Sequence, residues 1–411
     1  MKALVFGVDP DPVEAPPEDA PRLVQHLATT PMAIQEIDDP KLLGPDWAVL
    51  DTRLSGVCGS DTKQILMDFE DGGDSPMTAL ITFPQVLGHE VIATVAEAGP
   101  ELTGIETGQR VVLNPWLSCA PRGIDPPCPA CQAGDLSLCW NFTKGRLAAG
   151  IHSGNSADAT GGFAEKLPAH QSMMFPVPDG MPDEVAVLAD PFSVSLHAIT
   201  RNPPPESGRV VVYGSGALGT TANAILHALY PGVEVATVAA WPAQAALAER
   251  LGATVFHHEP AEAVIGQLAE WSGAGREMLH PWEGLPLVHP GHIDVVYDTV
   301  GSPRTVEIDM RVLASKGRLV QLGVSAPGRF EWTPWYFKEL RLLGSNAFGV
   351  EQVEGVRKHA MEHYFDLVTV GRIDLSGMLT HEFRLDEWRS AIRTLIDQGE
   401  TGAIKVAFDF R

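Results

Sequence analysis

Residues 209–219 read RVVVYGSGALG, and this stretch decides the fold. A short run of mostly β-branched apolar residues is typical of a parallel strand buried on both faces. It leads into a Gly-x-Gly-x-x-Gly pattern. Gly214 would allow a tight turn, Gly216 would let the backbone approach a pyrophosphate, and Gly219 would permit close packing of helix against strand. With a helix directly after it, the stretch predicts a dinucleotide site with the phosphates at the helix N-terminus.

The residues around this stretch alternate between strand and helix patterns. Helices are expected over Ala217 to Leu229 and over Pro242 to Leu251. Further strands are expected over Val233 to Val238, Ile293 to Tyr297, Arg318 to Leu322 and Leu340 to Leu343. Such alternation predicts an α/β fold with a doubly wound parallel sheet.

Three separate segments supply ligand types that a catalytic zinc uses. They are GVCGSD from residue 56, GHE from residue 88 and LADPF from residue 188, with Cys58, His89 and Asp190 as the candidate ligands. A thiolate, an imidazole and a carboxylate suit Zn²⁺, and three protein ligands leave a fourth position for water or substrate. Each of these residues alone could serve only packing or local hydrogen bonding. The zinc assignment is therefore supported mainly by the other motifs in the same chain.

A second group of possible metal ligands contains the remaining cysteines, Cys119, Cys128, Cys131 and Cys139. The last three follow Cys-x2-Cys-x7-Cys, and the two-residue gap lets both sulfurs reach one metal. The intervening sequence is rich in turn residues, so a metal would supply its order. The alternative is a loop of free or disulfide-linked thiols.

Composition limits the classes of function. The chain has 411 residues, enough for two domains, and a formal net charge of −23. That charge argues against nonspecific binding of nucleic acid or membrane surfaces, which would need a basic patch. No apolar run approaches the ~20 residues of a membrane-spanning helix. Met1 leads into a strand-like segment without a basic leader, so a cytoplasmic location is expected and disulfides are disfavoured.

Together these motifs resemble the zinc-dependent alcohol dehydrogenase branch of the medium-chain dehydrogenase/reductase superfamily. The resemblance spans nearly the whole chain and includes GGFAE from residue 161, DVVYDTVG from residue 294, GRLVQLG from residue 317 and TGAIKV from residue 401. The acidic third ligand, Asp190 followed by Pro191, is similar to that of polyol and threonine dehydrogenases. The resemblance implies a hydride transfer between a nicotinamide cofactor and a small alcohol, polyol or carbonyl compound.

The resemblance also implies the organisation of the chain. Residues 1–191 and 346–411 should form a GroES-like, distorted β-barrel catalytic domain, and residues 192–345 a Rossmann domain. It further implies two zinc ions per chain, one catalytic and one structural, NAD or NADP as cofactor, and a homodimer or homotetramer. Three stretches look like insertions, at residues 9–28, 67–82 and 276–290.

The family pattern assigns roles around the catalytic zinc. Ser60 stands where members place the first hydroxyl of a proton relay, and Asp61 would fix the tautomer of His89. Glu90 could ligate the metal or form a salt bridge elsewhere. Where many alcohol dehydrogenases continue the relay with a histidine, this chain has Lys63.

The structural lobe departs from the family spacing, Cys-x2-Cys-x2-Cys-x7-Cys. Counting back from Cys128, the first ligand position falls on Asp125 rather than on a cysteine. A longer loop can bring in Cys119, and a thiolate is the softer ligand. We favour Cys119 as the fourth ligand, with Asp125 as the alternative.

The coenzyme site departs as well. In NAD-selective members an acidic residue ends the second strand and binds the ribose hydroxyls. Here that position is Ala239, followed by Ala240 and Trp241, so neither a carboxylate nor a basic residue is present to select between NAD and NADP. The remaining expected coenzyme contacts are the glycine loop with Ala217 and Leu218, and Val300, Gly301, Leu322 and Gly323.

Two further functions remain alternatives. One is a zinc-retaining carbonyl reductase or an aldehyde-processing enzyme with a tightly held cofactor. The other is a noncatalytic dinucleotide sensor, against which the presence of Cys58, His89, Asp190 and Ser60 argues.

Overall fold

The glycine-rich stretch forms the strand and helix that its sequence predicts. The computed structural model describes residues 1–17, 19–67, 76–258, 260–326 and 328–411. In it, β9 (Arg209–Tyr213) leads through the glycine turn into α6 (Ala217–Leu229). Alternate residues of β9 face opposite sides: Val210 and Val212 join one apolar cluster with α6, while Val211 and Tyr213 join another. The strand is therefore buried on both faces, which explains its unbroken apolar sequence.

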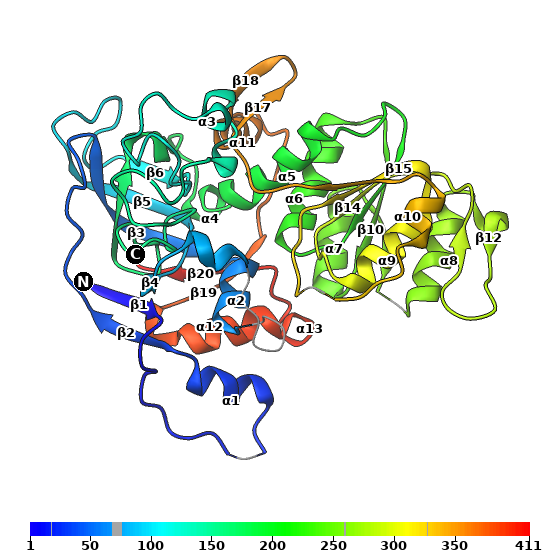
Figure 1. Ribbon diagram of the computed structural model, residues 1–411, viewed down its shortest axis with the longest axis horizontal. Helices are drawn as coiled ribbons and strands as arrows, with labels where there is room; N and C mark the ends of the chain where they lie inside the picture. Colours follow the sequence, from blue (N-terminus) through cyan, green and yellow to red (C-terminus); the bar gives the residue numbers. More distant parts are fainter. Residues whose placement is uncertain (18, 68–75, 259, 327) are drawn as a thin grey trace.

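Six parallel strands form the sheet around β9, with five helices along its faces (Figure 1). The strand order is β11 (Thr254–His257), β10 (Glu234–Ala239), β9, β14 (Ile293–Asp298), β15 (Leu313–Gln321) and β16 (Arg341–Gly344). The helices are α6, α7 (Pro242–Arg250), α8 (Ala261–Trp271), α9 (Pro303–Val312) and α10 (Thr333–Phe337). The sheet runs outward from β9 in both directions, so the expected doubly wound parallel sheet is confirmed.

The second part of the molecule is built on a seven-stranded sheet. Its order is β19 (Leu379–Phe383), β20 (Lys405–Asp409), β3 (Trp47–Gly56), β5 (Glu90–Ala98), β6 (Arg110–Leu113) and β8 (Met174–Pro176), with β7 (Lys166–His170) also paired to β3. Near the end of the chain, β20 pairs antiparallel with β3, so the C-terminal segment returns to the N-terminal part. A three-stranded sheet of β2 (Met32–Glu36), β1 (Lys2–Phe6) and β4 (Gln85–Val86) adjoins it.

The helices of this part lie around the sheets. They are α1 (Arg22–Thr29), α2 (Gly59–Ile65), α3 (Pro129–Ala133), α4 (Asp183–Ala186), α5 (Ala189–Arg201), α11 (Ala360–Thr369), α12 (Trp388–Ile396) and α13 (Gln398–Thr401). Helix α5 packs against α6 and so joins the two parts. The expected domain boundary at residues 191 and 192 falls within α5, and the division into residues 1–191 with 346–411 and residues 192–345 stays a prediction.

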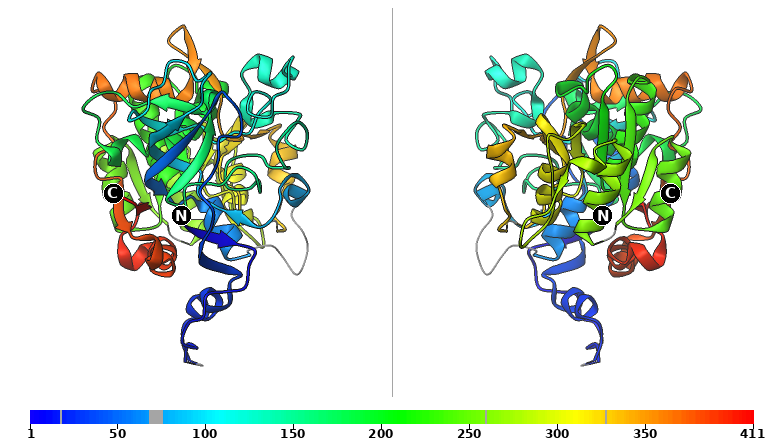
Figure 2. Two further views of the ribbon diagram at one scale, coloured as in Figure 1. Left: turned by 90° about the vertical axis from the view of Figure 1, so that its left-hand side faces the viewer. Right: turned by 90° about the vertical axis from the view of Figure 1, so that its right-hand side faces the viewer.

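Two of the three insertions form defined structure. Residues 9–28 contain most of α1, which projects from the body (Figure 2) and is tied to α12 by a hydrogen bond from Arg389 Nε to the carbonyl of Leu27, 3.1 Å long. Residues 276–290 form a hairpin of β12 (Met278–Leu279) and β13 (Leu287–Val288), with Trp282 fully exposed. In the predicted loop at residues 67–82, Pro76–Leu80 forms a short 3-10 helix, and residues 68–75 lie outside the described part.

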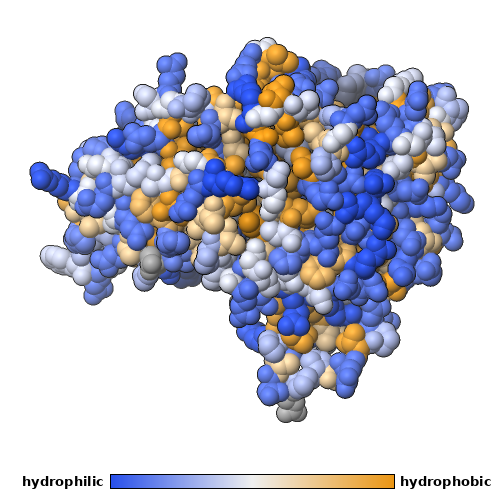
Figure 3. Space-filling view, turned by 180° about the vertical axis from the view of Figure 1, so that it is seen from behind, coloured by the Kyte–Doolittle hydropathy of each residue, from blue (hydrophilic) through white to orange (hydrophobic). Residues whose placement is uncertain are grey.

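The rear face carries mostly hydrophilic residues, with hydrophobic ones gathered in smaller groups (Figure 3). Among the described residues, no helix has the length and apolar character needed to cross a bilayer.

Candidate active site and metal centres

The first group of candidate ligands forms where three elements meet. Cys58 immediately precedes α2, His89 immediately precedes β5, and Glu90 is the first residue of β5. Their ligand atoms all lie within 4.8 Å of one another. Because β3 and β5 pair in the central sheet, residues 58 and 89 are held together by the backbone of the fold.

Asp61 holds both Cys58 and His89 in place. Its Oδ2 accepts a hydrogen bond of 2.9 Å from the backbone N–H of Cys58, and its Oδ1 lies 3.5 Å from Nδ1 of His89. Burial alone would raise the pKa of Asp61, but the positive charge of His89 and the N–H of Cys58 hold it below its ordinary value. Because Nδ1 faces Asp61, Nε2 is the nitrogen of His89 that remains for a metal.

Glu90 has a buried basic partner that the sequence patterns did not reveal. The side chains of Glu90 and Lys405 form a buried ion pair, and Lys405 Nζ also donates a 3.0 Å hydrogen bond to the carbonyl of Val57. Burial by itself would lower the pKa of Lys405, but the negative charges of Glu90 and Cys58 raise it above its ordinary value. Lys405 follows Glu90 by more than three hundred residues, so no local spacing connects them.

Asp190 lies beside this group without belonging to it. It occupies the first turn of α5, and its ligand atoms are not among those within 4.8 Å of one another. Its carboxylate is buried, and Oδ2 has no hydrogen-bond partner among the described residues. Burial raises the pKa of Asp190 to about 7, and the positive charge of His89 offsets this only in part. A buried carboxylate oxygen without a partner is costly, and a divalent cation would satisfy it.

The donor set therefore fits zinc. A thiolate, an imidazole and buried carboxylates meet at one place, as in catalytic zinc sites with open coordination positions. Ser60 follows Cys58 in the first turn of α2, where its side chain is exposed and has no hydrogen bond to the described residues. Lys63 lies one turn further along the same helix.

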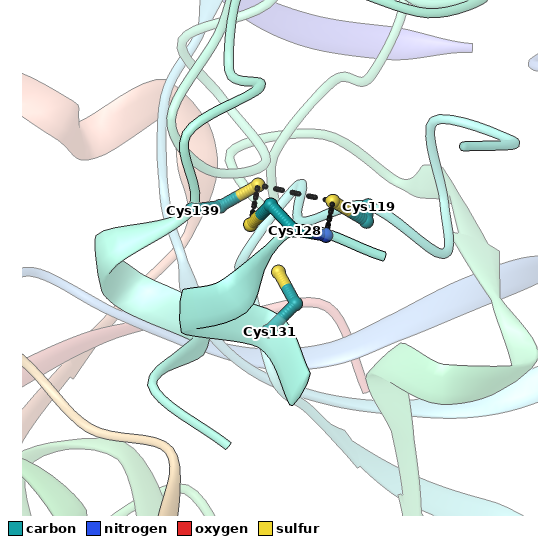
Figure 4. A group of neighbouring side chains, drawn as sticks. All are labelled: Cys119, Cys128, Cys131 and Cys139. Atoms are coloured by element: carbon teal, nitrogen blue, oxygen red, sulfur yellow. Dashed lines mark hydrogen bonds between the residues drawn. The ribbon is translucent and has the colours of Figure 1, made fainter. Parts of the chain in front are cut away.

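The second group contains the four predicted cysteines (Figure 4). All four sulfur atoms lie within 4.8 Å of one another, and none forms a disulfide. Cys119 Sγ is 3.6 Å from Cys139 Sγ, which is 4.0 Å from Cys128 Sγ. Tetrahedral zinc with bonds of about 2.3 Å to sulfur needs sulfur pairs about 3.8 Å apart, so the spacing fits. Asp125, the alternative ligand, is exposed and outside the group.

Three of the four sulfurs accept hydrogen bonds from N–H groups. Backbone N–H groups donate to Cys119 from residue 128 at 3.3 Å, to Cys128 from residue 140 at 3.5 Å and to Cys139 from residue 141 at 3.4 Å. The amide of Asn141 adds a bond of 3.2 Å to Cys119. Such donors favour the charged form of a ligand, as metal binding requires.

Arg122 organises the loop around this lobe. The side chain is buried, and its guanidinium donates to the carbonyl oxygens of Leu117, Lys144, Leu147, Ala148 and Gly150 at 2.7–3.1 Å. A planar guanidinium carries five N–H donors in a fixed fork, and here all of its nitrogens are used. Motif spacing gave no indication of this residue.

The glycine loop has the geometry that a dinucleotide site needs. Gly214 adopts φ +90°, and a Cβ there would lie 2.6 Å from Oγ1 of Thr299. A Cβ on Gly219 would lie 2.1 Å from the carbonyl oxygen of Gly214, so helix and strand approach too closely for any side chain. Gly216, in contrast, faces open space at the start of α6, where a phosphate would approach the helix N-terminus.

The loops after the next two strands complete this edge of the sheet. Asp298 Oδ1 accepts 2.9 Å hydrogen bonds from the backbone N–H groups of Val300 and Gly301. Gly301 and Gly323 are so close that a Cβ on Gly301 would lie 1.9 Å from the carbonyl oxygen of Gly323. Leu322 lies just after β15, so these predicted coenzyme residues gather at the carboxyl ends of β14 and β15.

The end of β10 carries no charged residue that could distinguish NAD from NADP. Ala239 ends β10 and is buried, whereas Ala240 and Trp241 are exposed. The indole of Trp241 lies against Gly399 of α13, where a Cβ would come within 2.6 Å of the ring. Trp241 thus contacts the C-terminal segment from the nucleotide-binding side.

Comparisons with known proteins agree with this architecture. The sequence model of the protein family described as the alcohol dehydrogenase GroES-like domain matches residues 44–179. The sequence model of the family described as zinc-binding dehydrogenase matches residues 217–362. The chain is 27% identical to (R,R)-butanediol dehydrogenase of Saccharomyces cerevisiae, covering 89% of this chain and 92% of the relative. It is 28% identical to L-threonine 3-dehydrogenase of Chromobacterium violaceum, covering 87% and 90%.

A solved structure shares the fold over the same length. It is a zinc-binding dehydrogenase from Sinorhizobium meliloti with NADP bound, and it superimposes with a TM-score of 0.68 at 26% identity, covering 92% of this chain and 96% of that one. The N-terminal part is therefore GroES-like and the nucleotide-binding part Rossmann-like, as the sequence predicts.

Proposed function

Because the chain belongs to the zinc-dependent alcohol dehydrogenase branch of the medium-chain dehydrogenase/reductase superfamily, we propose a specific arrangement of its catalytic centre. The protein is an oxidoreductase that transfers hydride between a nicotinamide cofactor and a small alcohol or polyol, or the corresponding carbonyl compound. We assign the catalytic metal to Cys58, His89 and Asp190, and the structural metal to the four cysteines of the lobe, which gives two zinc ions per chain.

One observation carries the assignment of the third ligand. Glu90 lies within 4.8 Å of Cys58 and His89, but its charge is balanced by Lys405. Asp190 is buried nearby with an oxygen that has no partner among the described residues. Glu90 forms a direct ion pair with Lys405, whereas Asp190 forms none, although the charges of His89 and Lys405 also act on Asp190. The carboxylate without a direct partner gains most from a cation, so Asp190 is the proposed ligand and Glu90 a neighbouring carboxylate.

The residues of the site would divide the chemistry among them. Bound zinc would act as a Lewis acid on the substrate oxygen, making loss of the hydroxyl proton possible near neutral pH. The Ser60 hydroxyl, exposed beside Cys58, would take up that proton and pass it outward, because a hydroxyl both accepts and donates. Asp61 would hold His89 in the tautomer that presents Nε2. The glycine loop and the loops after β14 and β15 would place the cofactor for hydride transfer.

Metal analysis with matched variants tests the assignment. The unmodified protein should contain two zinc ions, and Cys58→Ser should lose one of them with nearly all activity while the fold is kept. Asp190→Asn should lower the occupancy of the same site, whereas Glu90→Gln should leave it filled. One zinc ion in the unmodified protein, or a Cys58→Ser enzyme of full activity, contradicts the assignment. The reverse result for Asp190 and Glu90 makes Glu90 the ligand.

A substrate panel separates the enzyme from a dinucleotide sensor. Absorbance of the reduced nicotinamide is followed with alcohols, vicinal diols, sugar alcohols and 3-hydroxy amino acids, and with their carbonyl counterparts in reverse. An enzyme should turn over at least one pair, with activity lost in Cys58→Ser. A sensor would bind NADH, seen by fluorescence, without turning over any compound.

Both coenzymes should be accepted. Ala239 replaces the carboxylate that would repel a 2′-phosphate, and no arginine or lysine at positions 240 and 241 attracts one. The Sinorhizobium meliloti relative contains NADP. We therefore propose that the specificity constants for NAD and NADP lie within roughly a hundredfold, about 3 kcal/mol.

A homodimer or homotetramer is the proposed assembly. Large apolar side chains are exposed on and beside α10, among them Trp332, Tyr336 and Phe337. Strand β16 pairs only with β15 among the described residues, so its outer edge is open. Residues 276–290 and 329–344 around this edge contain four acidic and four basic residues in a chain with a net charge of −23. A second copy would therefore meet little net charge here.

A further inference from the structure

Helix α5 carries a proposed zinc ligand and packs against the helix that begins the coenzyme site (Figure 1). Asp190 occupies the first turn of α5. Ala217 is the first residue of α6 and directly follows Gly216 of the glycine loop. One helix interface therefore connects an element of the metal site with an element of the coenzyme site.

Two buried hydroxyl groups cross this interface. Ser195 Oγ of α5 donates a 2.9 Å hydrogen bond to the carbonyl of Leu218, in the first turn of α6. Thr221 Oγ1 of α6 lies 3.2 Å from the carbonyl oxygen of Pro191, in the first turn of α5. The two hydroxyl oxygens are 2.7 Å apart, and both side chains are fully buried. Because a hydroxyl has one proton to donate, each helix can donate one hydrogen bond to the other.

The link between the helices does not depend on a single proton position. Thr221 Oγ1 also lies 3.1 Å and 3.0 Å from the carbonyl oxygens of Ala217 and Leu218 in its own helix. Whichever carbonyl receives the Thr221 proton, Ser195 still joins α5 to α6, through the Leu218 carbonyl or through the Thr221 hydroxyl. The two hydroxyls therefore act as one connection.

The carbonyls at both ends of this connection belong to residues beside the two sites. Pro191 follows Asp190, and the proline ring fixes the rotation about its own N–Cα bond, so the Pro191 carbonyl moves with the backbone of Asp190. Leu218 is the second residue of α6, a helix whose unpaired first N–H groups would face the phosphates. A shift of Asp190 would thus be transmitted to the first turn of α6.

We propose that Ser195 and Thr221 are positioning residues that couple the catalytic metal site to the coenzyme site. Because the two first turns are held together, a filled metal site places α6 for the phosphates, and a bound coenzyme holds Asp190 for the metal. Thermodynamic linkage makes the two effects equal, so zinc tightens coenzyme binding by the same factor as coenzyme tightens zinc binding. This inference rests on the proposed metal assignment.

The affinity for NADH, measured with and without the catalytic zinc, tests the coupling. Dissociation constants are determined by fluorescence titration for the zinc-loaded protein and for Cys58→Ser, with zinc analysis of both. Their quotient is the coupling factor. It is measured again with Ser195→Ala, Thr221→Val and Thr221→Ser in both backgrounds. Ser193→Ala is the matched control, because this buried hydroxyl donates within α5, to the carbonyl of Ala189 at 2.6 Å.

NADH should bind the zinc-loaded protein at least about fivefold more tightly than the Cys58→Ser protein, the lower end of typical coupling between sites. Thr221→Val and Ser195→Ala should each lower this factor, and the double variant should bring it to about one. Thr221→Ser keeps the hydroxyl and should retain the factor, as should Ser193→Ala. A merely structural role would weaken NADH binding equally in both backgrounds and leave the quotient unchanged.

Equal NADH affinities in the two backgrounds overturn the inference, as does an unchanged factor in the double variant or an equal fall in Ser193→Ala. If the double variant does not fold, the single variants decide by the same criterion. A Cys58→Ser protein that keeps both zinc ions, or an unmodified protein that does not bind NADH, contradicts the proposed site and the inference together. Loss of one zinc ion with equal NADH affinity contradicts the inference alone.

Discussion

Position 239 is where an acidic side chain would favour NAD over NADP. Ala239 is buried at the end of β10, beside the backbone N–H of His258, which donates a 2.7 Å hydrogen bond to its carbonyl. Ala239→Asp would add a carboxylate that accepts from ribose hydroxyls and repels a 2′-phosphate. We expect the ratio of NAD to NADP specificity constants to rise at least about tenfold.

Steady-state kinetics with both coenzymes check this, and Ala240→Asp serves as the neighbouring control. A preference of a thousandfold or more in the unmodified enzyme, in either direction, would mean that another residue recognises the 2′ position.

Lys338 is a buried amine whose charge should make stability depend on pH. Its Nζ donates to the carbonyls of Met310, Arg311 and Leu313 at 2.5–3.4 Å, at the C-terminal end of α9. Burial, and then the charge of Arg311, lower the pKa of Lys338 to about 7. The unfolded chain therefore binds the extra proton between pH 7 and the ordinary pKa of lysine, and the free energy of unfolding rises with pH in that window.

Comparison with Lys338→Met isolates this contribution. The stability difference between the unmodified protein and the variant should grow by about 2 kcal/mol from pH 7 to pH 9 and stay constant below pH 6. Urea unfolding at several pH values measures it, with Lys316→Met, at an exposed lysine, as the control. Parallel curves for the two proteins would show that the three carbonyls keep Lys338 charged throughout.

Single residues differ in how far the sequence predicts them. Cys58 follows β3 and His89 precedes β5, and these two strands pair in one sheet, so the meeting of the two residues follows from the fold. The spacing of the other four cysteines predicts their grouping. Lys405 could not be predicted in this way, nor could His152, whose ring centroid lies 4.7 Å from that of His89, because each meets the site through contacts between distant segments. Their residue types are also common in surface positions, so they carry no motif signal.

Among the elements, the cysteine lobe depends most on a metal. Cys131→Ser should remove the structural zinc and lower the thermal midpoint by at least about 3 °C, while acting on the chemistry only indirectly. Zinc content and thermal unfolding are measured together. Catalytic zinc and kcat/KM retained in the fraction that stays folded would agree with this separation of roles.

Paired variants decide the fourth ligand of the lobe. Cys119→Ala should lose the structural zinc, because its sulfur lies among the other three, and Asp125→Ala should keep it, because Asp125 is exposed. Loss of that zinc in Asp125→Ala alone would reverse the preference.

Element boundaries followed the sequence closely where one pattern dominates. The expected limits of β9 and α6 match the structure, because the apolar run and the glycines bound them directly. Strand β15 begins at Leu313, five residues before the expected start at Arg318. The additional residues include Lys316, whose φ is +67°, and Gly317, and a strand pattern does not predict such residues. The hairpin of β12 and β13 was expected only as an interruption, because strands of two residues have no periodicity to recognise.

At the scale of the whole molecule, the open edge beside β16 should set the assembly. The unmodified protein should sediment as a dimer or tetramer of the 44.1 kDa chain. Tyr336→Arg with Phe337→Glu places charges on the exposed face of α10 and should shift it toward the monomer, because buried unpaired charges cost several kcal/mol. Val370→Arg, an exposed position at the end of α11, is the control. A monomeric unmodified protein, or an unchanged assembly in the double variant, contradicts this interface.

Arg122 has a consequence for how the protein is loaded with metal. One side chain fastens the carbonyl of Leu117 and four carbonyls between residues 144 and 150, so the two ends of the lobe are held together by a guanidinium as well as by any ion. An apoprotein would then keep the two ends of the lobe together, and zinc would have to order only the cysteine segment between them. Reconstitution after chelation should be fast and complete, and in Arg122→Met it should become slow and partly irreversible.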